Sequence, residues 1–484
     1  MKTTKNTSPY WAVCPECNGR SKKRRKLRKK VRLLYQIALK EFEITNGEGT
    51  PPVPPKGDLY PCLDCSGSGL ISSASKPIPT KEIYPHVAII GGGIGGVALA
   101  VACLHRGIPF TLYERDTGFN TRSQGYGLTL QQASKAIEGL GIFSLKGRLI
   151  STKHVVHNPD GIVIAEWGVR KWLQKNETGY PKRTNVHIAR QSLRLALLEQ
   201  LGGNDAVQWG HQLVDFKKSK NDGVELSFSL NGEIKTHRAD LIVGADGIRS
   251  SVRSLLIGEN STPLRYLGCI VILGICSLEA LEGVESALLD SATVFQTVNG
   301  NERIYMMPYS QDAIMWQFSF QTPLEEAKAL SALGAKALKE EAIRRMQWHH
   351  PVPQIIAATL EAQVSGYPVY DRELLRPELL ATGGPVTLIG DAAHPMSPFK
   401  GQGANQALLD ALALARGIAK GCRAQSDWRD AGLRESVLTE FESEMLERSA
   451  IKVKDSADAA GFLHSDIVLH EADEPRGRAR NGLN

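Results

Sequence analysis

A glycine-rich turn between an apolar run and a small-residue segment constrains this chain more than any other feature. The apolar run is Val87–Ile90, and Gly91, Gly93 and Gly96 follow it in the pattern Gly-x-Gly-x-x-Gly. Such spacing permits a tight turn, close approach of a pyrophosphate to the backbone, and close packing of a helix on a strand. We expect the helix over Gly95–Arg106, so the sequence predicts a dinucleotide-binding βα unit.

An acidic residue at a suitable distance supports this prediction. Glu114 ends a second apolar run and lies 23 residues after Gly91. A carboxylate there binds the ribose hydroxyls of a dinucleotide. The N-terminus of the predicted helix offers free N–H groups and the positive end of its dipole to the phosphates.

The basic charge of the chain is local. The 484 residues allow two or three domains, and their net charge is +7. Residues 1–80 hold 15 lysines and arginines against six acidic residues, so the remainder carries a net charge of −2. The body of the protein is therefore not expected to bind polyanions in general.

Targeting signals are weak. Residues 1–10 are polar without an apolar core, so secretion is not expected. The uncharged stretch 87–104 contains the glycine turn, which favours strand, turn and helix over a membrane span. Eight cysteines in a chain of this length do not suggest a disulfide scaffold, so we expect a cytoplasmic location.

Two further apolar strands end in acidic motifs. Leu241–Val243 leads into Gly-Ala-Asp246-Gly, and Val386–Ile389 leads into Gly390-Asp391, with Pro398 and the turn 401–405 downstream. Both motifs place an acid at the carboxyl end of a strand, where doubly wound sheets bind their ligands.

Together, the three motifs resemble the single-component FAD-dependent aromatic hydroxylases of the para-hydroxybenzoate hydroxylase family, over about residues 85–420. The resemblance implies an α/β (α+β) fold with a Rossmann-like FAD-binding domain, a β-sheet substrate domain and C-terminal helices. The expected bounds are 81–255 with 381–465 for FAD, 256–380 for substrate with part of 120–190, and 466–484 for a polar tail.

The resemblance also implies roles for particular residues. Asp391 should hold the ribitol chain, Asp246 should serve both FAD and a transient nicotinamide, and Arg190 should contact the flavin. The turn 401–405 should begin a helix whose N-terminus stabilises the anionic reduced flavin. The expected cofactor-binding residues are Gly91, Gly93, Gly95, Gly96, Glu114, Arg115, Arg190, Asp246, Gly390, Asp391, Pro398, Gly401, Gly403, Ala404 and Asn405.

The implied reaction uses NAD(P)H and O2 to hydroxylate an aromatic or other electron-rich small molecule through a flavin hydroperoxide. No second Gly-x-Gly-x-x-Gly is present for NAD(P)H, which fits a transient co-substrate. No catalytic residue is assigned, although His394 is a candidate for a proton relay. Four residues of the mid-chain sheet either line the substrate pocket or belong to plain core: Met306, Met307, Trp316 and Phe318.

Other functions are also compatible with the sequence. One is a flavoprotein with a binding or regulatory role whose basic N-terminal segment engages nucleic acid or an acidic partner. The others are a flavin-dependent halogenase, which shares the first motif, and a saturase-type reductase. The segment from Trp167 to Trp172 does not match the Gly-Trp-x-Trp-x-Ile-Pro signature of halogenases, which disfavours halogenation.

A matched pair of cysteine motifs precedes the body. Cys14 and Cys17, and Cys62 and Cys65, each stand in Cys-x-x-Cys-x-Gly, and the second pair resembles a DnaJ-type zinc knuckle. Four thiolates suit a structural zinc ion, whereas free thiols or two disulfides are the alternatives.

The segment between the cysteine pairs is predicted to form a basic helical arm over Arg20–Ile44, held at its base by zinc. Its apolar stripe comprises Leu27, Val31, Leu34, Ala38 and Phe42. Nine basic residues lie within 22–32. Contact with nucleic acid or an acidic partner is one interpretation, and a solvated charged face is the other.

Overall fold

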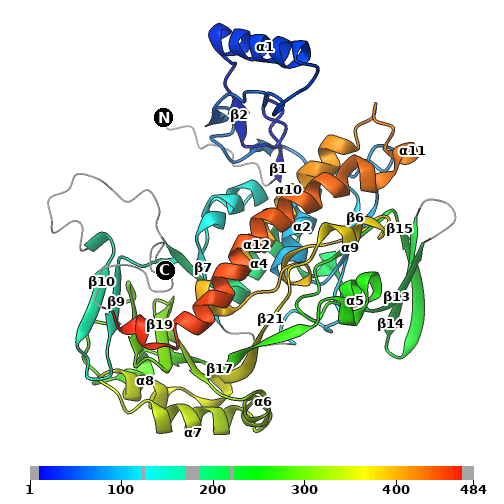
Figure 1. Cartoon of the computed structure of the whole chain (residues 1–484). Coiled ribbons are helices and arrows are strands. Elements are labelled where there is room, and N and C mark those ends of the chain that lie inside the picture. Colours follow the sequence, from blue (N-terminus) through cyan, green and yellow to red (C-terminus); the bar gives the residue numbers. More distant parts are fainter. Residues whose placement is uncertain (1–9, 122–125, 171–184, 219–222, 471–484) are drawn as a thin grey trace, which may run out of the picture. The chain divides into compact units, whose positions relative to one another are not determined.

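The computed structural model describes residues 10–121, 126–170, 185–218 and 223–470, and it divides into two compact units (Figure 1). The first unit is Met1–Ile78 and the second is Pro79–Asn484. Within the described ranges, no helix is both long enough and apolar enough to cross a membrane.

A five-stranded parallel sheet forms the centre of the second unit, in the order β12-β6-β5-β16-β22. Its strands are β5 (Val87–Ile90), β6 (Phe110–Tyr113), β12 (Val207–Gln208), β16 (Leu241–Gly244) and β22 (Val386–Leu388). Every neighbouring pair is parallel. The carboxyl ends of these strands therefore meet at one edge, where the glycine turn and both aspartate motifs follow.

Helices pack on this sheet and on one another. The longer ones are α2 (Ile94–Leu104), α4 (Arg190–Leu201), α10 (Gly403–Gly421) and α12 (Thr439–Phe462), and the shorter ones are α5 (Ser251–Ile257), α9 (Pro377–Ala381) and α11 (Trp428–Leu433). Helix α2 contacts both α4 and α10, and α10 runs beside α12 (Figure 1). Because its side chains are small and apolar, α2 is buried along nearly its whole length.

A seven-stranded sheet forms the other half of this unit, in the order β10-β9-β18-β19-β20-β17-β21. Its strands are β9 (Lys153–His157), β10 (Val163–Trp167), β17 (Leu264–Ser277), β18 (Thr293–Val298), β19 (Glu302–Ser310), β20 (Ala313–Gln321) and β21 (Val364–Arg372). Neighbours are antiparallel except β9 and β18.

Three helices cover one face of the seven-stranded sheet: α6 (Leu324–Ala332), α7 (Ala335–Arg345) and α8 (Val352–Ala358). Gly334 separates α6 from α7 and adopts a φ of 84°. Met306, Trp316 and Phe318 lie on this covered face and pack with the helices. Met307 lies on the opposite face, as the alternation of a strand requires.

Two three-stranded sheets are the remaining sheets among the described residues of the second unit. One is β7-β11-β8 and the other is β13-β14-β15. Their strands are β7 (Gly127–Leu130), β8 (Leu149–Ile150), β11 (Val186–Ala189), β13 (Gln212–Lys218), β14 (Val224–Leu230) and β15 (Glu233–Ala239). Asn231 and Gly232 form the hairpin turn between β14 and β15, with φ angles of 52° and 87°.

The described part of the first unit, residues 10–78, contains two strand pairs and one helix. Strand β1 (Tyr10–Val13) pairs with β4 (Leu70–Ser73), and β2 (Lys22–Arg24) pairs with β3 (Leu59–Pro61).

Helix α1 spans Lys29–Ile44, so the predicted helix over Arg20–Ile44 is wrong in its first third. Residues 22–24, which follow the Cys14–Cys17 turn, form strand β2 instead. This strand pairs with β3, which precedes the Cys62–Cys65 turn. Like charges at helical spacing also disfavour a helix there.

Candidate active site

The glycine turn after β5 is packed on one side and open on the other. Gly91 has a φ of 111°, and a Cβ atom there would lie 2.5 Å from the carbonyl oxygen of Ala245. A Cβ on Gly96 would lie 1.9 Å from the carbonyl oxygen of Gly91. A Cβ on Gly93 would meet no atom within 4 Å. Free space therefore lies in front of the N-terminus of α2, where a diphosphate would bind.

Glu114, at the end of β6, holds the backbone of this turn. Its Oε2 accepts a hydrogen bond from the backbone N–H of Gly92 at 2.7 Å, and its Oε1 accepts one from Asp116 at 3.0 Å. Arg115, the next residue, is exposed.

Arg194 is a buried residue of this site that sequence reasoning missed. Its Nε donates to the carbonyl oxygen of Gly92 at 2.7 Å, and its guanidinium lies 4.8 Å from the ring centroid of Phe119. Arg194 follows Arg190 by four residues in α4, so the two side chains leave the same helix face. This four-residue spacing is the sequence signal from which a role for Arg194 in the site could have been predicted.

Asp246, after β16, has one carboxylate oxygen free within the described residues. Its Oδ2 accepts from the backbone N–H groups of Ser251 and Val252, at 2.7 and 3.3 Å, and so caps α5. Its Oδ1 is buried without a hydrogen-bond partner. Burial raises the pKa of this carboxyl. A buried orphan acceptor suits a hydroxyl donor of a bound cofactor.

The loop after β22 is held by a buried network. Asp410 of α10 accepts from the backbone N–H of Gly390 at 2.9 Å and lies 2.7 Å from His394 Nε2. Arg448 of α12 donates to the other Asp410 oxygen at 2.8 Å. Burial disfavours ionisation of Asp410, but His394 and Arg448 outweigh it, so its pKa is lowered.

Asp391 is exposed at the end of this loop, although protein surrounds it. Burial raises its pKa, while His394 and Arg190 act in the opposite direction. The Asp391 carboxyl is therefore accessible to a ligand. A Cβ on Gly403 would lie 3.4 Å from Asp391 Oδ1, so the start of α10 adjoins this carboxyl.

Asn405 joins the start of α10 to the segment after β7. Its Oδ1 accepts from the backbone N–H groups of Gln131 and Ala133, at 2.8 and 3.1 Å. Its Nδ2 donates to the carbonyl oxygens of Thr129 and Gly401, both at 2.9 Å. The side chain is buried and fully used in these contacts, and the first turn of α10 holds no acidic residue.

Two tyrosines lie near Asp391 and Arg190. The Arg190 guanidinium lies 5.7 Å from the ring centroid of Tyr126. The pKa of Tyr367, on β21, is raised first by burial and then by Tyr126 and Asp391, whereas Arg190 acts in the opposite direction. These four side chains therefore lie near one another, and Tyr367 comes from β21 of the seven-stranded sheet.

The sheet face opposite α6–α8 carries polar side chains among apolar ones. Register places Gln296, Arg303, Tyr305 and Gln317 on this face. Arg303 Nε donates to Gln296 Oε1 at 2.8 Å, and its guanidinium lies 4.9 Å from the Tyr305 ring centroid.

Buried donors on this face lack acceptors. Arg303 and Gln317 are 4% and 7% exposed, and Arg303 Nη1 and Gln317 Nε2 have no hydrogen-bond partner within the described part of the chain. Burial lowers the pKa of Arg303 to about 10, so it stays charged at neutral pH.

The segment that precedes α10 contacts this same face. Phe399 packs against the buried cluster of this sheet that contains Val271 and Val369, and its ring lies 5.4 Å from that of His464. His464 Nε2 in turn lies 2.9 Å from Ser319 Oγ on β20. The cofactor loops and the polar sheet face therefore belong to one region.

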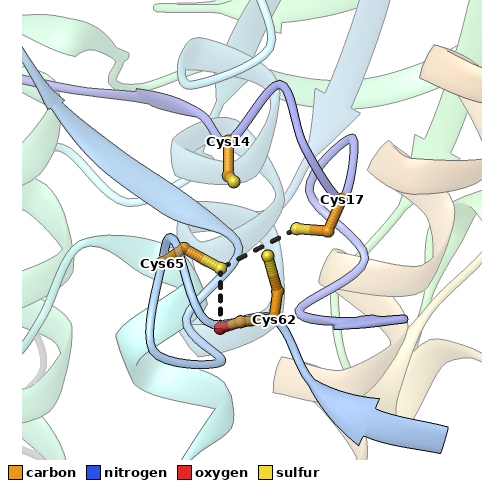
Figure 2. Close-up of side chains that lie close together, drawn as sticks. All are labelled: Cys14, Cys17, Cys62 and Cys65. Atoms are coloured by element: carbon orange, nitrogen blue, oxygen red, sulfur yellow. Dashed lines mark hydrogen bonds between the residues drawn. The ribbon is translucent and has the colours of Figure 1, made fainter. Parts of the chain in front are cut away.

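In the first unit, the four cysteines of the paired motifs converge (Figure 2). All four are buried and free of disulfides, and their sulfur atoms lie within 4.8 Å of one another. Cys17 Sγ and Cys65 Sγ are 3.8 Å apart, and the backbone N–H of Gly69 points at Cys65 Sγ at 3.2 Å. Burial raises the pKa of the Cys17 thiol to about 12, so a thiolate there requires a nearby cation.

Comparison with known proteins identifies the second unit. Residues 84–431 match the family described as the FAD binding domain. Aurachin C monooxygenase/isomerase of Stigmatella aurantiaca is 32% identical over 335 residues, which cover 68% of this chain and 79% of that protein. The 3-amino-4-hydroxybenzoate 2-monooxygenase PtmB3 of Streptomyces platensis is 29% identical over 338 residues, with coverages of 68% and 78%.

Solved structures share the fold. The 2,6-dihydroxypyridine-3-hydroxylase of Arthrobacter nicotinovorans gives a TM-score of 0.65 at 17% identity, covering 82% of this chain and 96% of that one. Klebsiella pneumoniae HpxO complexed with FAD and uric acid gives a TM-score of 0.63 at 23% identity, and the match covers 79% of this chain and 90% of that one.

The chain belongs to the FAD binding domain family, and it is a FAD-dependent monooxygenase. The resemblance, fold class and flavin monooxygenase function predicted from the sequence are confirmed. The residues present fit FAD: the space at Gly93, the orphan oxygen of Asp246 and the accessible carboxyl of Asp391 lie after three parallel strands.

Proposed function

We propose that this monooxygenase takes electrons from NAD(P)H and inserts one oxygen atom of O2 into an aromatic substrate that carries a carboxylate or similar acceptor group. The observation that carries the substrate class is the pair of buried, unpartnered donors at Arg303 and Gln317. A buried guanidinium without an acid beside it is costly, and an anionic ligand group would complete its hydrogen bonds.

The relatives support an aromatic substrate. Their names give 3-amino-4-hydroxybenzoate and 2,6-dihydroxypyridine as compounds that they act on, and one related structure holds uric acid. In the present chain, Tyr126 and Tyr367 lie near Arg190 and would stack or hydrogen-bond with such a ring.

We propose the following roles for residues around the cofactor. When bound, FAD supplies the redox chemistry, accepting a hydride from NAD(P)H and reacting with O2. The backbone at Gly93 and the α2 N-terminus bind the diphosphate, and Asp391 binds the ribitol hydroxyls. Asp246 Oδ1 accepts from a cofactor hydroxyl. The α10 N-terminus, without an acid in its first turn, stabilises negative charge at the pyrimidine end of the flavin.

Some residues around the cofactor act through others in this proposal. His394 and Asp410 position the loop at Gly390, and Asn405 positions the start of α10. Arg115 is exposed beside Glu114, so its side chain is accessible to a bound cofactor, and we keep it as a proposed contact.

The test uses FAD-loaded protein with NADPH or NADH and two matched pairs, 4-hydroxybenzoate with 4-hydroxybenzamide and anthranilate with anthranilamide. We expect an acid to stimulate NAD(P)H oxidation and to gain one oxygen atom by mass spectrometry. Flavin absorbance titrations should show at least about tenfold tighter binding of acids than of amides.

Arg303→Met should abolish that preference, whereas Arg238→Met, at an exposed position of β15, should keep it. If no aromatic compound stimulates NAD(P)H oxidation, the proposed reaction is wrong. Equal binding of acids and amides would contradict the acceptor subsite alone.

We also propose that the four cysteines bind structural zinc. Zn–S bonds of about 2.3 Å in a tetrahedron place sulfur atoms about 3.8 Å apart, and the Cys17–Cys65 distance is 3.8 Å. Metal analysis should find one zinc per wild-type chain and a loss in Cys62→Ser, with Cys276→Ser as the control at another buried cysteine. Equal zinc content in wild type and Cys62→Ser would exclude this site.

A further inference from the structure

Helix α1 of the first unit presents apolar and basic side chains to solvent together. It has 16 residues and is about 24 Å long. None of its residues is buried. Free-standing helices of this length are marginal in water, so an unpartnered apolar side indicates a surface that the helix binds.

One apolar side of α1 is used within its own unit. Tyr35, Ala38 and Phe42 recur at spacings of three and four residues and are half-buried. The Phe42 ring lies near Gly47, where a Cβ atom would be 3.7 Å away. Contacts of this side attach the helix to its own unit. They do not involve the remaining surface of the helix.

A second apolar stripe has no cover within the described residues. At 100° per residue, Leu33, Ile37 and Ile44 project in nearly the same direction. They are 54%, 45% and 80% exposed. Lys29 and Lys40 flank this stripe on one side and Lys30 on the other.

The residues before α1 add further positive charge. Lys22–Arg32 contains nine basic residues and no acidic one. Within the described part of the chain, Lys23 pairs with Glu16, whereas Lys26, Lys29 and Lys30 have no carboxylate partner. The basic charge is therefore available to an external anion.

We propose that α1 and the basic segment before it bind an anionic lipid surface, with the helix lying in the plane of the interface. Such a surface uses both features at once, since acyl chains accept Leu33, Ile37 and Ile44 while headgroups attract the flanking lysines. Lysine stems reach outward along the apolar stripe in this arrangement. A nucleic acid would use the charge but leave three exposed aliphatic side chains in water.

The test is vesicle flotation of the full-length FAD-loaded protein, using phosphatidylcholine vesicles with and without phosphatidylserine. We expect binding to be at least about tenfold tighter with phosphatidylserine and to weaken as salt is added, because each basic residue near the surface contributes about fivefold.

Two double variants separate the apolar contribution to vesicle binding from the electrostatic one, and each has a matched control. Leu33→Gln with Ile37→Gln removes the apolar stripe, and Leu333→Gln with Leu360→Gln removes two exposed leucines elsewhere. Lys29→Gln with Lys30→Gln removes charge, and Lys235→Gln with Lys336→Gln is its control. Both α1 variants should lose at least about tenfold in vesicle affinity, and both controls should bind as wild type.

Other results would overturn the proposal. These are no binding to phosphatidylserine vesicles, equal binding to neutral vesicles, or full binding by the Leu33→Gln, Ile37→Gln variant. Tighter binding to a short RNA duplex or to polyglutamate than to vesicles would assign the surface to those polymers instead. Unchanged zinc content and far-UV circular dichroism verify that each variant is folded.

Discussion

Arg194 Nε donates a 2.7 Å hydrogen bond to the carbonyl oxygen of Gly92, so a side chain from α4 fixes the glycine turn that follows β5. Glu114 holds the N–H of the same glycine. The peptide units on both sides of Gly92 are therefore oriented before any cofactor binds, and orientation in advance lowers the entropy lost on binding.

Replacing Arg194 by lysine should weaken FAD binding at least about tenfold. Lysine keeps the charge but loses the planar donor group, and a buried hydrogen bond from a charged group contributes about 1.5–3 kcal/mol. FAD fluorescence quenching measures the dissociation constant, and Arg238→Lys is the exposed control. Unchanged affinity in Arg194→Lys would show that the turn keeps its shape without this bond.

Two glycine substitutions should separate folding from cofactor binding. Gly93→Ala fills open space, so we expect the apoprotein to melt as wild type yet lose at least about a hundredfold in FAD affinity. Gly96→Ala drives a Cβ atom against the Gly91 carbonyl, so it should lower the melting temperature itself. Calorimetry of the apoproteins checks both, with Gly461→Ala as a control in open space. A destabilised Gly93→Ala apoprotein would contradict the assignment.

Asp410 should make stability fall in acid. Its folded pKa is lowered by His394 and Arg448, whereas an unfolded aspartate titrates near about 3.9. Its stabilising contribution is thus complete above that value and is lost as the pH falls through it towards the folded pKa.

We expect Asp410→Asn to lower the free energy of unfolding by about 3 kcal/mol at pH 7 and to flatten its acid dependence. Urea titrations between about pH 3 and about pH 7, a range that includes the pKa of an unfolded aspartate, provide the measurement. An unchanged acid slope in the variant would assign the dependence to other carboxyls.

Asp246→Asn should uncouple cofactor binding from stability. Burial raises the pKa of Asp246, so its ionised form is a cost to the folded state that vanishes as the pH falls below about 3.9. An amide oxygen still accepts from Ser251 and Val252.

The apoprotein of Asp246→Asn should therefore be at least as stable as wild type at pH 7, while FAD affinity should fall about tenfold because the orphan acceptor is gone. Asp458→Asn, at an exposed position of α12, is the control for both measurements. A less stable apoprotein that binds FAD normally would contradict this interpretation.

The glycine turn and both aspartate motifs were predictable because local sequence dictates them. Each follows a short buried strand, and each chemical requirement lies within about ten residues of it. The same holds for the cysteine turns, where spacing alone brings each pair together.

The features that could not be predicted depend on contacts between segments that are distant in the sequence. Arg194 meets Gly92 across 102 residues, and Asp410 meets Arg448 across 38. Met306 and Met307 could not be assigned to faces without the strand register. The start of α1 was misplaced because β2 pairs with β3, which a helical pattern in one segment does not reveal.

The segment between the two cysteine turns begins and ends at adjacent points of the first unit. Arg25 N–H donates to the carbonyl oxygen of Asp58 at 2.9 Å, directly beyond the β2–β3 pair. A two-residue Asn-Gly turn could join these positions as a hairpin. Residues between them can therefore be inserted, lost or exchanged in evolution or by engineering, while the paired strands still deliver both cysteine turns to the same point.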